Sequence, residues 1–142
     1  MKNLDVQQRL LSFLREYAAG NDLYWVPLTT LKKDIPVVAY DMDAIYRNGC
    51  VWLLEKVFRT CEISKVRTFQ TDSMEYFEDD DVTELLYEKD SDGFVFPRTV
   101  ETFYFDGSEQ WLCYVSHEGT ISFTGEKMAS AAGEILPDKY RI

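Results

Sequence analysis

The sequence predicts an α+β domain in which one antiparallel sheet of about five or six strands is covered by two or three helices. The last third of the chain alternates runs of strand-forming residues with short turns, whereas two earlier stretches, residues 4–18 and 41–61, repeat apolar residues at helical spacing. A length of 142 residues with 46% hydrophobic residues suits a single core. We therefore expect residues 1–142 to form one domain.

The strand predictions rest on three aromatic and β-branched segments in that last third: residues 100–105, 111–116 and 120–124. Their connections are short, and short connections join antiparallel neighbours. The middle segment is apolar on both faces, which predicts a central strand and a buried Trp111. The third segment alternates Thr120, Ser122 and Thr124 with Ile121 and Phe123. This alternation predicts one face in water and one in the core.

The remaining elements follow from shorter patterns along the chain. We expect a helix over residues 4–18, an edge strand over 23–28, strands over 37–40 and 65–71, a polar connection from 72 with one helical turn at 82–87, a short strand at 94–96 and a closing helix over 126–135. No internal repeat and no linker long enough to divide the chain interrupts this order.

Residues 41–61 admit two interpretations. Asn48-Gly49 is a strong hairpin dipeptide, but the apolar residues on either side of it also fit a helix. Asp41 or Asp43 would cap such a helix, and Trp52 would lie on its buried face. We favour the helix and expect Gly49 to pack closely against another backbone, because glycine inside a helix costs about 1 kcal/mol relative to alanine.

The negative charge is concentrated in one block. Residues 72–92 contain ten acidic residues and one lysine, so this block carries a charge of −9 out of the total of −10. Such a block repels phosphate backbones and anionic membranes and attracts basic protein surfaces. The sequence therefore disfavours nucleic acid and membranes as partners and favours a basic protein.

The compartment is inferred from three features. No apolar run is longer than that at residues 50–54, which is too short to span a bilayer, since a span needs about 20 residues. The N-terminal residues also lack the apolar centre of a signal peptide. Cys50, Cys61 and Cys113 have no CxxC spacing and resemble free thiols of a reducing compartment. We expect a cytoplasmic protein.

The acidic block has two interpretations. It is either a solvated loop or a docking surface in which carboxylates speed the encounter with a basic partner and aromatic side chains supply the buried contact. The residues expected to bind such a partner are Tyr76, Phe77, Glu78, Asp79, Asp80, Asp81 and Glu84.

The only histidine lies in a possible turn, Ser116-His117-Glu118. Adjacent residues of a strand point to opposite faces, so these three cannot form a catalytic triad among themselves, and we expect them to order the turn. An enzyme that uses His117 with a nearby carboxylate or thiol is the alternative. No catalytic residue, metal ligand or cofactor is assigned, because the cysteines and His117 lack chelating spacing and a calcium-loop-like run at residues 88–99 lacks its final glutamate.

Three segments carry a resemblance: WVPL at residues 25–28, VVAYDMD at 37–43 and FDGSEQWLCYVSHEGTISFTG at 105–125. The chain resembles small bacterial proteins without an assigned activity, and it is similar in style to the immunity proteins of bacterial toxin systems. The resemblance implies a non-enzymatic inhibitor that covers the basic site of a toxin or nuclease. A regulatory or structural interaction protein is a further alternative, and the oligomeric state stays open.

Overall fold

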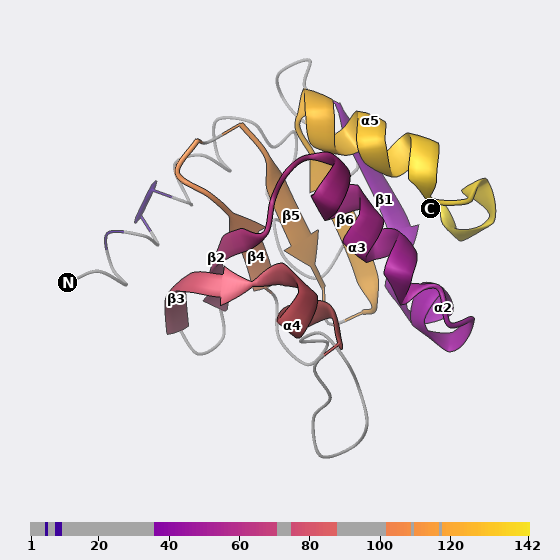
Figure 1. The fold of residues 1–142 in the computed structure, drawn as a ribbon, viewed down its shortest axis with the longest axis horizontal. Coiled ribbons are helices and arrows are strands. Elements are labelled where there is room, and N and C mark those ends of the chain that lie inside the picture. The colour runs from indigo at the N-terminus through magenta and orange to yellow at the C-terminus, as the bar shows by residue number, and fades with distance from the viewer. Residues whose placement is uncertain are drawn as a thin grey trace.

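The computed structural model of the protein describes residues 5, 8, 9, 36–70, 75–87, 102–108, 110–116 and 118–142. Six strands form one sheet: β1 (Val37–Asp41), β2 (Lys65–Gln70), β3 (Glu75–Asp81), β4 (Thr102–Phe105), β5 (Leu112–Val115) and β6 (Thr120–Thr124). The spatial order is β1-β6-β5-β4-β2-β3, and every neighbouring pair is antiparallel (Figure 1).

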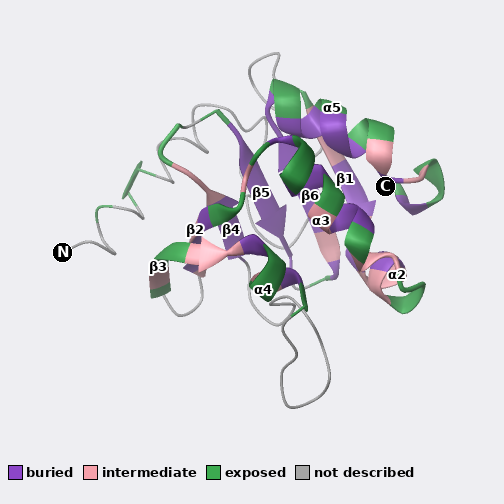
Figure 2. Ribbon diagram, in the orientation of Figure 1, coloured by how far each residue is buried: buried purple, intermediate pink, exposed green. Residues whose placement is uncertain are grey.

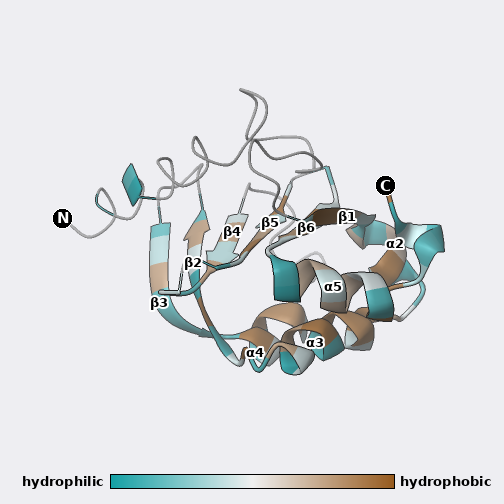
Figure 3. Ribbon diagram, turned by 90° about the horizontal axis from the view of Figure 1, so that it is seen from above, coloured by the Kyte–Doolittle hydropathy of each residue, from teal (hydrophilic) through white to brown (hydrophobic). Residues whose placement is uncertain are grey.

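Four helices accompany the sheet in the described residues: α2 (Met42–Arg47), α3 (Val51–Thr60), α4 (Val82–Tyr87) and α5 (Glu126–Ile135), followed by a 3-10 turn at Asp138–Tyr140. Seen from above, α3, α4 and α5 form a second layer on one side of the sheet (Figure 3). The predicted α+β class with one antiparallel sheet is confirmed, as are the strand that begins at Val37 and the helix Glu126–Ile135.

The core is centred on β5, as the sequence predicted. β5 lies between β4 and β6, and all four of its residues are buried, as Figure 2 shows. Cys113 and Val115 belong to the core cluster that the helices cover. On the opposite face Tyr114 stacks on Phe103 with ring centroids 4.7 Å apart. Both faces of the strand are therefore packed.

The predicted solvent-facing side of β6 is wrong, because Ser122 and Thr124 are buried. Thr124 Oγ1 donates a hydrogen bond of 3.0 Å to the Leu112 carbonyl oxygen. A small hydroxyl side chain that finds a backbone acceptor can be buried at little cost. The alternation of hydroxyl and apolar residues therefore marks two buried faces of different polarity.

Residues 41–61 form two helices, so the prediction of one continuous helix is wrong. Asp41 caps α2, with Oδ1 accepting a hydrogen bond of 3.0 Å from the Ala44 N–H. The chain then turns at Gly49, whose φ is +69°, a conformation that favours glycine. A Cβ at Gly49 would meet no atom within 4 Å, so the expected close backbone contact is absent there. Asn48-Gly49 is thus a turn between two helices.

The described part of the acidic block, residues 75–87, has more regular structure than a polar connection. Residues 75–81 form β3, which pairs with β2 through a register shift between Val66 and Thr68, whereas the predicted helical turn at residues 82–87 is confirmed as α4. β3 is the last strand of the described sheet. Charged side chains and a bulge are common on such strands, because they face water and oppose pairing with another chain.

Several predictions lie outside the described residues. These are the strands at residues 23–28 and 94–96 and most of the helix at residues 4–18. Of that helix, the structure describes Asp5, Gln8 and Arg9, which are helical and exposed.

Candidate functional site

We use the name acidic surface for the seven residues of β3 and α4 that the sequence singled out: Tyr76, Phe77, Glu78, Asp79, Asp80, Asp81 and Glu84. The structure brings them together, because β3 runs directly into α4 at Asp81. Four of the seven are exposed, and Tyr76, Asp80 and Asp81 are half-buried. None of them is buried, so the whole set is accessible at the end of the sheet.

The carboxylates of this surface have different roles. Asp81 lies 3.7 Å from Lys65 Nζ, and its Oδ1 accepts a hydrogen bond of 3.0 Å from the Glu84 N–H at the start of α4. Asp81 is therefore partly neutralised and caps the helix. Within the described residues, the side chains of Asp79 and Asp80 form no ion pair or hydrogen bond. These two are the carboxylates best placed to meet an external cation.

Large aromatic side chains are exposed next to the carboxylates. Phe77 is 42% exposed in β3 and Tyr87 is 43% exposed at the end of α4. Trp52 of α3 is 54% exposed, so its predicted place on a buried face is wrong. α3 begins directly after the turn at Gly49, which the prediction of one continuous helix did not include. Because this turn interrupts the helical spacing, a different side of α3 faces the core.

Glu55 connects the two helices that carry Trp52 and Tyr87. Its carboxylate accepts hydrogen bonds from Arg59 at 2.8 Å, from Thr83 at 3.2 Å and from the Tyr87 hydroxyl at 3.0 Å. Partial burial and the bond to Glu55 raise the pKa of Tyr87, which therefore stays a neutral donor. The network holds α4 against α3 and fixes the exposed Tyr87 ring.

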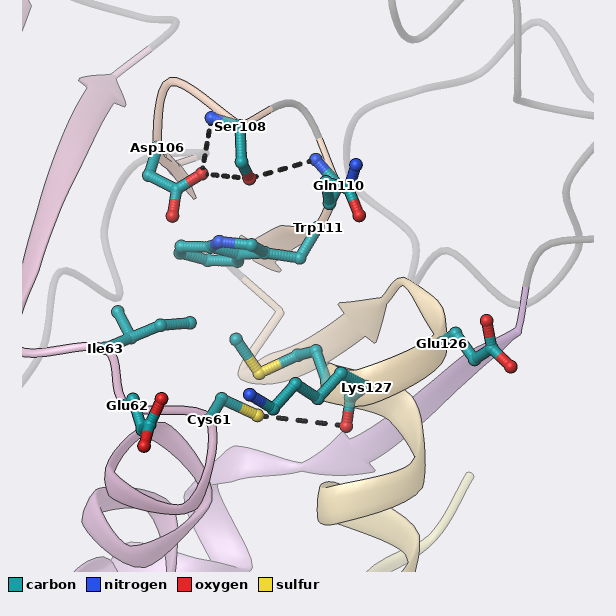
Figure 4. A pocket seen from close by; sticks show the side chains of 10 residues that line it. Cys61, Glu62, Ile63, Asp106, Ser108, Gln110, Trp111, Glu126 and Lys127 are labelled. Atoms are coloured by element: carbon teal, nitrogen blue, oxygen red, sulfur yellow. Dashed lines mark hydrogen bonds between the residues drawn. The ribbon is translucent and has the colours of Figure 1, made fainter.

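A hollow of about 730 Å³, here called the Trp111 hollow, lies beside the other end of α3. It is lined by the end of α3, the β4–β5 turn and the start of α5 (Figure 4): Cys61, Glu62, Ile63, Asp106, Ser108, Gln110, Trp111, Glu126, Lys127 and Met128. Its volume lies within the range of about 300–1,000 Å³ that is typical of ligand pockets. The sequence did not predict this hollow.

Asp106 holds the turn above Trp111. Its Oδ1 accepts hydrogen bonds from the N–H and the hydroxyl of Ser108. Partial burial raises the pKa of Asp106, but the bonds from Ser108, the nearby indole N–H of Trp111 and the charge of Arg67 outweigh burial, so the net pKa lies below its usual value. The buried indole N–H has no hydrogen-bond partner of standard geometry, but it lies close enough to Asp106 to lower the pKa of that carboxyl.

Replacing Ser108 with alanine should raise the pKa of Asp106 toward its ordinary value. Because this pKa is lowered by folding, the stability that Asp106 contributes is present above the unfolded pKa of about 3.9 and is lost as the pH falls through the folded value. In Ser108→Ala this contribution should be smaller, and its loss should be complete at a higher pH than in the wild type. Carboxyl NMR titration measures the shift, and Ser130→Ala, at an exposed position of α5, is the matched control. An unchanged Asp106 titration would contradict the assigned role of Ser108.

The turn Ser116-His117-Glu118 is described in part. Ser116 is buried, and its Oγ lies 2.6 Å from Thr120 Oγ1 across the turn. Glu118 is exposed, and His117 lies outside the described residues. The Gly119 carbonyl oxygen accepts hydrogen bonds from the first N–H groups of α2, that of Met42 at 2.8 Å and that of Asp43 at 3.3 Å. Gly119, the residue after this turn, is thus hydrogen-bonded to the start of α2.

The thiols of Cys61 and Cys113 are poorly suited to nucleophilic attack. All three cysteines are free, and Cys61 and Cys113 are buried. Burial raises the pKa of both, although the nearby Lys127 opposes the shift at Cys61. A protonated thiol is a weak nucleophile. Across the described ranges, no three histidine, cysteine or acidic side chains gather as metal ligands, and none of the helices there has the length and apolar character needed to cross a membrane.

Comparison with known proteins adds no relative. The chain matches no protein-family model, no curated protein and no solved structure.

Proposed function

We propose that the protein is a non-enzymatic binding protein whose acidic surface docks a basic protein partner. The observation that carries the proposal is the placement of exposed aromatic side chains beside carboxylates that form no ion pair with any described residue. Phe77 lies in the same strand as Asp79 and Asp80, and Tyr87 ends the helix that follows. Carboxylates steer a basic partner toward the surface, and aromatic rings then bury apolar area against it.

The geometry favours a docking surface over a solvated loop that serves only to keep the protein soluble. A solvated loop has no need of regular structure, whereas these charges lie on a paired strand and a helix capped by Asp81. The network centred on Glu55 also holds Tyr87 in place before any partner arrives. Preorganised side chains lose less conformational entropy on binding, so they bind more tightly.

The similarity in style to immunity proteins suggests the class of partner. In this proposal the partner is a basic toxin or nuclease, and the acidic surface covers the site at which it would bind phosphate. The positive charge of such a site makes it complementary to β3 and α4. A basic regulatory partner would use the same surface.

Charge reversal of Asp79, Asp80 and Glu84 to lysine should abolish association with the basic partner while leaving the fold intact. Asp81 is left unchanged because it caps α4. Asp79 and Glu84 are exposed and Asp80 is half-buried. Charges near the surface contribute little to stability, so the denaturation midpoint should stay close to that of the wild type. Proteins retained from a lysate by the wild type and by the variant are compared at low and high salt. The protein lost by the variant should be basic, and high salt should weaken its retention because steering is screened over about 8–10 Å.

A second triple variant controls for net charge. Glu118, Glu134 and Asp138 are exposed and lie away from β3, in the β5–β6 turn, in α5 and in the 3-10 turn after it. Their reversal to lysine changes the total charge by the same amount and should leave association intact. Equal losses in both triple variants, or equal retention by both, would reject the acidic surface as the docking site.

A further inference from the structure

A β-bulge in β3 decides where the side chains of this strand point. In the β2–β3 ladder, Phe77 lies opposite Thr68. Three residues further along β3, Asp80 lies opposite Val66, which is only two residues away from Thr68. Directly opposite residues of an antiparallel pair share a face, and so do residues two apart in one strand. Phe77 and Asp80 therefore point to the same face, whereas residues three apart in a regular strand point to opposite faces.

The face that Phe77 and Asp80 share is the one that the helices cover. Val66 belongs to the core cluster on the helix side, and so does Tyr104, which pairs with Thr68 from β4. α4 begins directly after β3 and lies on this side of the sheet (Figure 3). Phe77 is nevertheless 42% exposed, and Asp80 is half-buried. The two side chains are thus accessible together beside α4.

Asp79, the residue before Asp80, points to the opposite face. The bulge places Glu78 and Asp79 together opposite Arg67. Arg67 alternates with Val66 along β2, so its side chain leaves the sheet on the side away from the helices. β3 thus presents an aromatic ring and a carboxylate on the helix side, and carboxylates opposite an arginine on the other side. The helix side is the better site for a cation from a partner.

The site formed by Phe77 and Asp80 is open to an external cation. Among the described residues, no cation pairs with Asp80 or lies over the Phe77 ring. Lys65 pairs at 3.7 Å with Asp81, one position further along the ladder. Adjacent ladder positions point to opposite faces, so Lys65 does not cover the helix side of β3. The Asp80 carboxylate therefore keeps its full capacity to accept hydrogen bonds from a partner.

We propose that Phe77 and Asp80 bind an arginine side chain of the basic partner, an inference that rests on the proposed function and names the group that the acidic surface recognises. The guanidinium plane lies on the Phe77 ring, and two of its N–H groups donate to the Asp80 carboxylate. The two residues lie opposite positions two apart on β2, roughly 7 Å, which one arginine side chain spans. Lysine fits less well, because its ammonium group cannot stack and is more strongly hydrated.

The first test uses the capped peptide acetyl-Gly-Arg-Gly-Arg-Gly-amide, with a lysine counterpart and a citrulline counterpart, which keeps the shape of arginine without its charge. The peptides are titrated into the wild-type protein and followed by NMR. The lysine and citrulline peptides should bind more weakly than the arginine peptide, citrulline by about tenfold. The arginine methylene protons should shift upfield because they lie over the Phe77 ring, and Phe77→Leu should abolish this shift. A lysine peptide that binds as tightly as the arginine peptide, or an upfield shift that persists at full size in Phe77→Leu, would overturn the proposal.

The second test compares two adjacent aspartates. Asp80→Asn and Asp79→Asn remove the same charge one residue apart, but only Asp80→Asn removes the carboxylate on the helix side. Asp80→Asn should therefore weaken binding of the arginine peptide about tenfold, and Asp79→Asn by no more than about twofold. Neither side chain bonds to a described residue, so both variants should keep the denaturation midpoint of the wild type. Equal weakening by the two variants, or weakening by neither, contradicts the assignment of Asp80.

The outcome for the arginine site is independent of the outcome for docking. If the Asp79, Asp80 and Glu84 triple variant loses the partner while Asp80→Asn and Asp79→Asn bind the arginine peptide equally well, docking stands and the arginine site fails. If Asp80→Asn alone loses the arginine peptide but the triple variant keeps the partner, the site binds arginine and the proposed docking surface fails.

Discussion

Replacing Trp111 with alanine should lower the free energy of unfolding by roughly 3–5 kcal/mol. The side chain is only 7% exposed and belongs to the core cluster. Its ring meets Phe58 edge to face, with centroids 6.2 Å apart, so truncation opens a cavity between the sheet and α3. Urea denaturation followed by circular dichroism measures the change. A midpoint close to that of the wild type would show that the ring does not support the core.

Trp52→Ala is the matched control for that experiment. Trp52 has the same side chain but is 54% exposed on α3, so its loss should change stability by no more than about 0.5 kcal/mol. A large loss of stability in Trp52→Ala would mean that this ring is packed in solution and unsuited to docking.

Gly125→Ala should cost roughly 2–4 kcal/mol, the second largest effect that we expect. Gly125 begins α5 with φ +106°, a conformation that strains any residue with a side chain. An added Cβ would also overlap the Gln110 carbonyl oxygen and press on Trp111. Because the obstacle is backbone, α5 and the β4–β5 turn would have to move apart. Thermal and urea denaturation should both report the loss.

Gly133→Ala should have the opposite effect on stability, although this glycine is in the same helix. Gly133 lies in α5, and an added Cβ would meet no atom within 4 Å. Alanine is favoured over glycine in helices by up to about 1 kcal/mol, so this variant should be more stable than the wild type. Equal effects at Gly125 and Gly133 would contradict the close approach at the start of α5.

The sequence predicted the sheet well where local patterns and burial agree. β5 is apolar on both faces and lies in the interior of the sheet. The short turns on either side of it predicted antiparallel neighbours. α4 and α5 were also predicted with the observed bounds. In each of these segments, residue preference and tertiary environment favour the same structure.

The errors arose where a local signal had more than one tertiary solution. Asn48-Gly49 supplies a left-handed turn, which suits a hairpin, but here it joins two helices. That turn also rotates α3 and exposes Trp52, and this exposure cannot be predicted from helical spacing alone. β3 was missed because its acidic residues disfavour a strand in general, yet water at the end of a sheet tolerates them.

The candidate site was predicted only in part for a related reason. The acidic surface is continuous in sequence, so counting charges was enough to find it. The Trp111 hollow is assembled from three segments, around Cys61, Asp106 and Glu126, which meet only in the folded chain. The one local signal at that site is Glu62, and its left-handed conformation cannot be recognised without the backbone.

The strand order has a consequence for the folding kinetics. β4, β5 and β6 pair with their neighbours in the chain, whereas β1 must pair with β6. The first and the last described strands in chain order therefore close a long loop. Loop closure costs entropy before the contacts it forms can offset that cost. We expect the β4–β6 meander to form early and β1 to join it late. Mutations in β1 should therefore speed unfolding more than they slow folding.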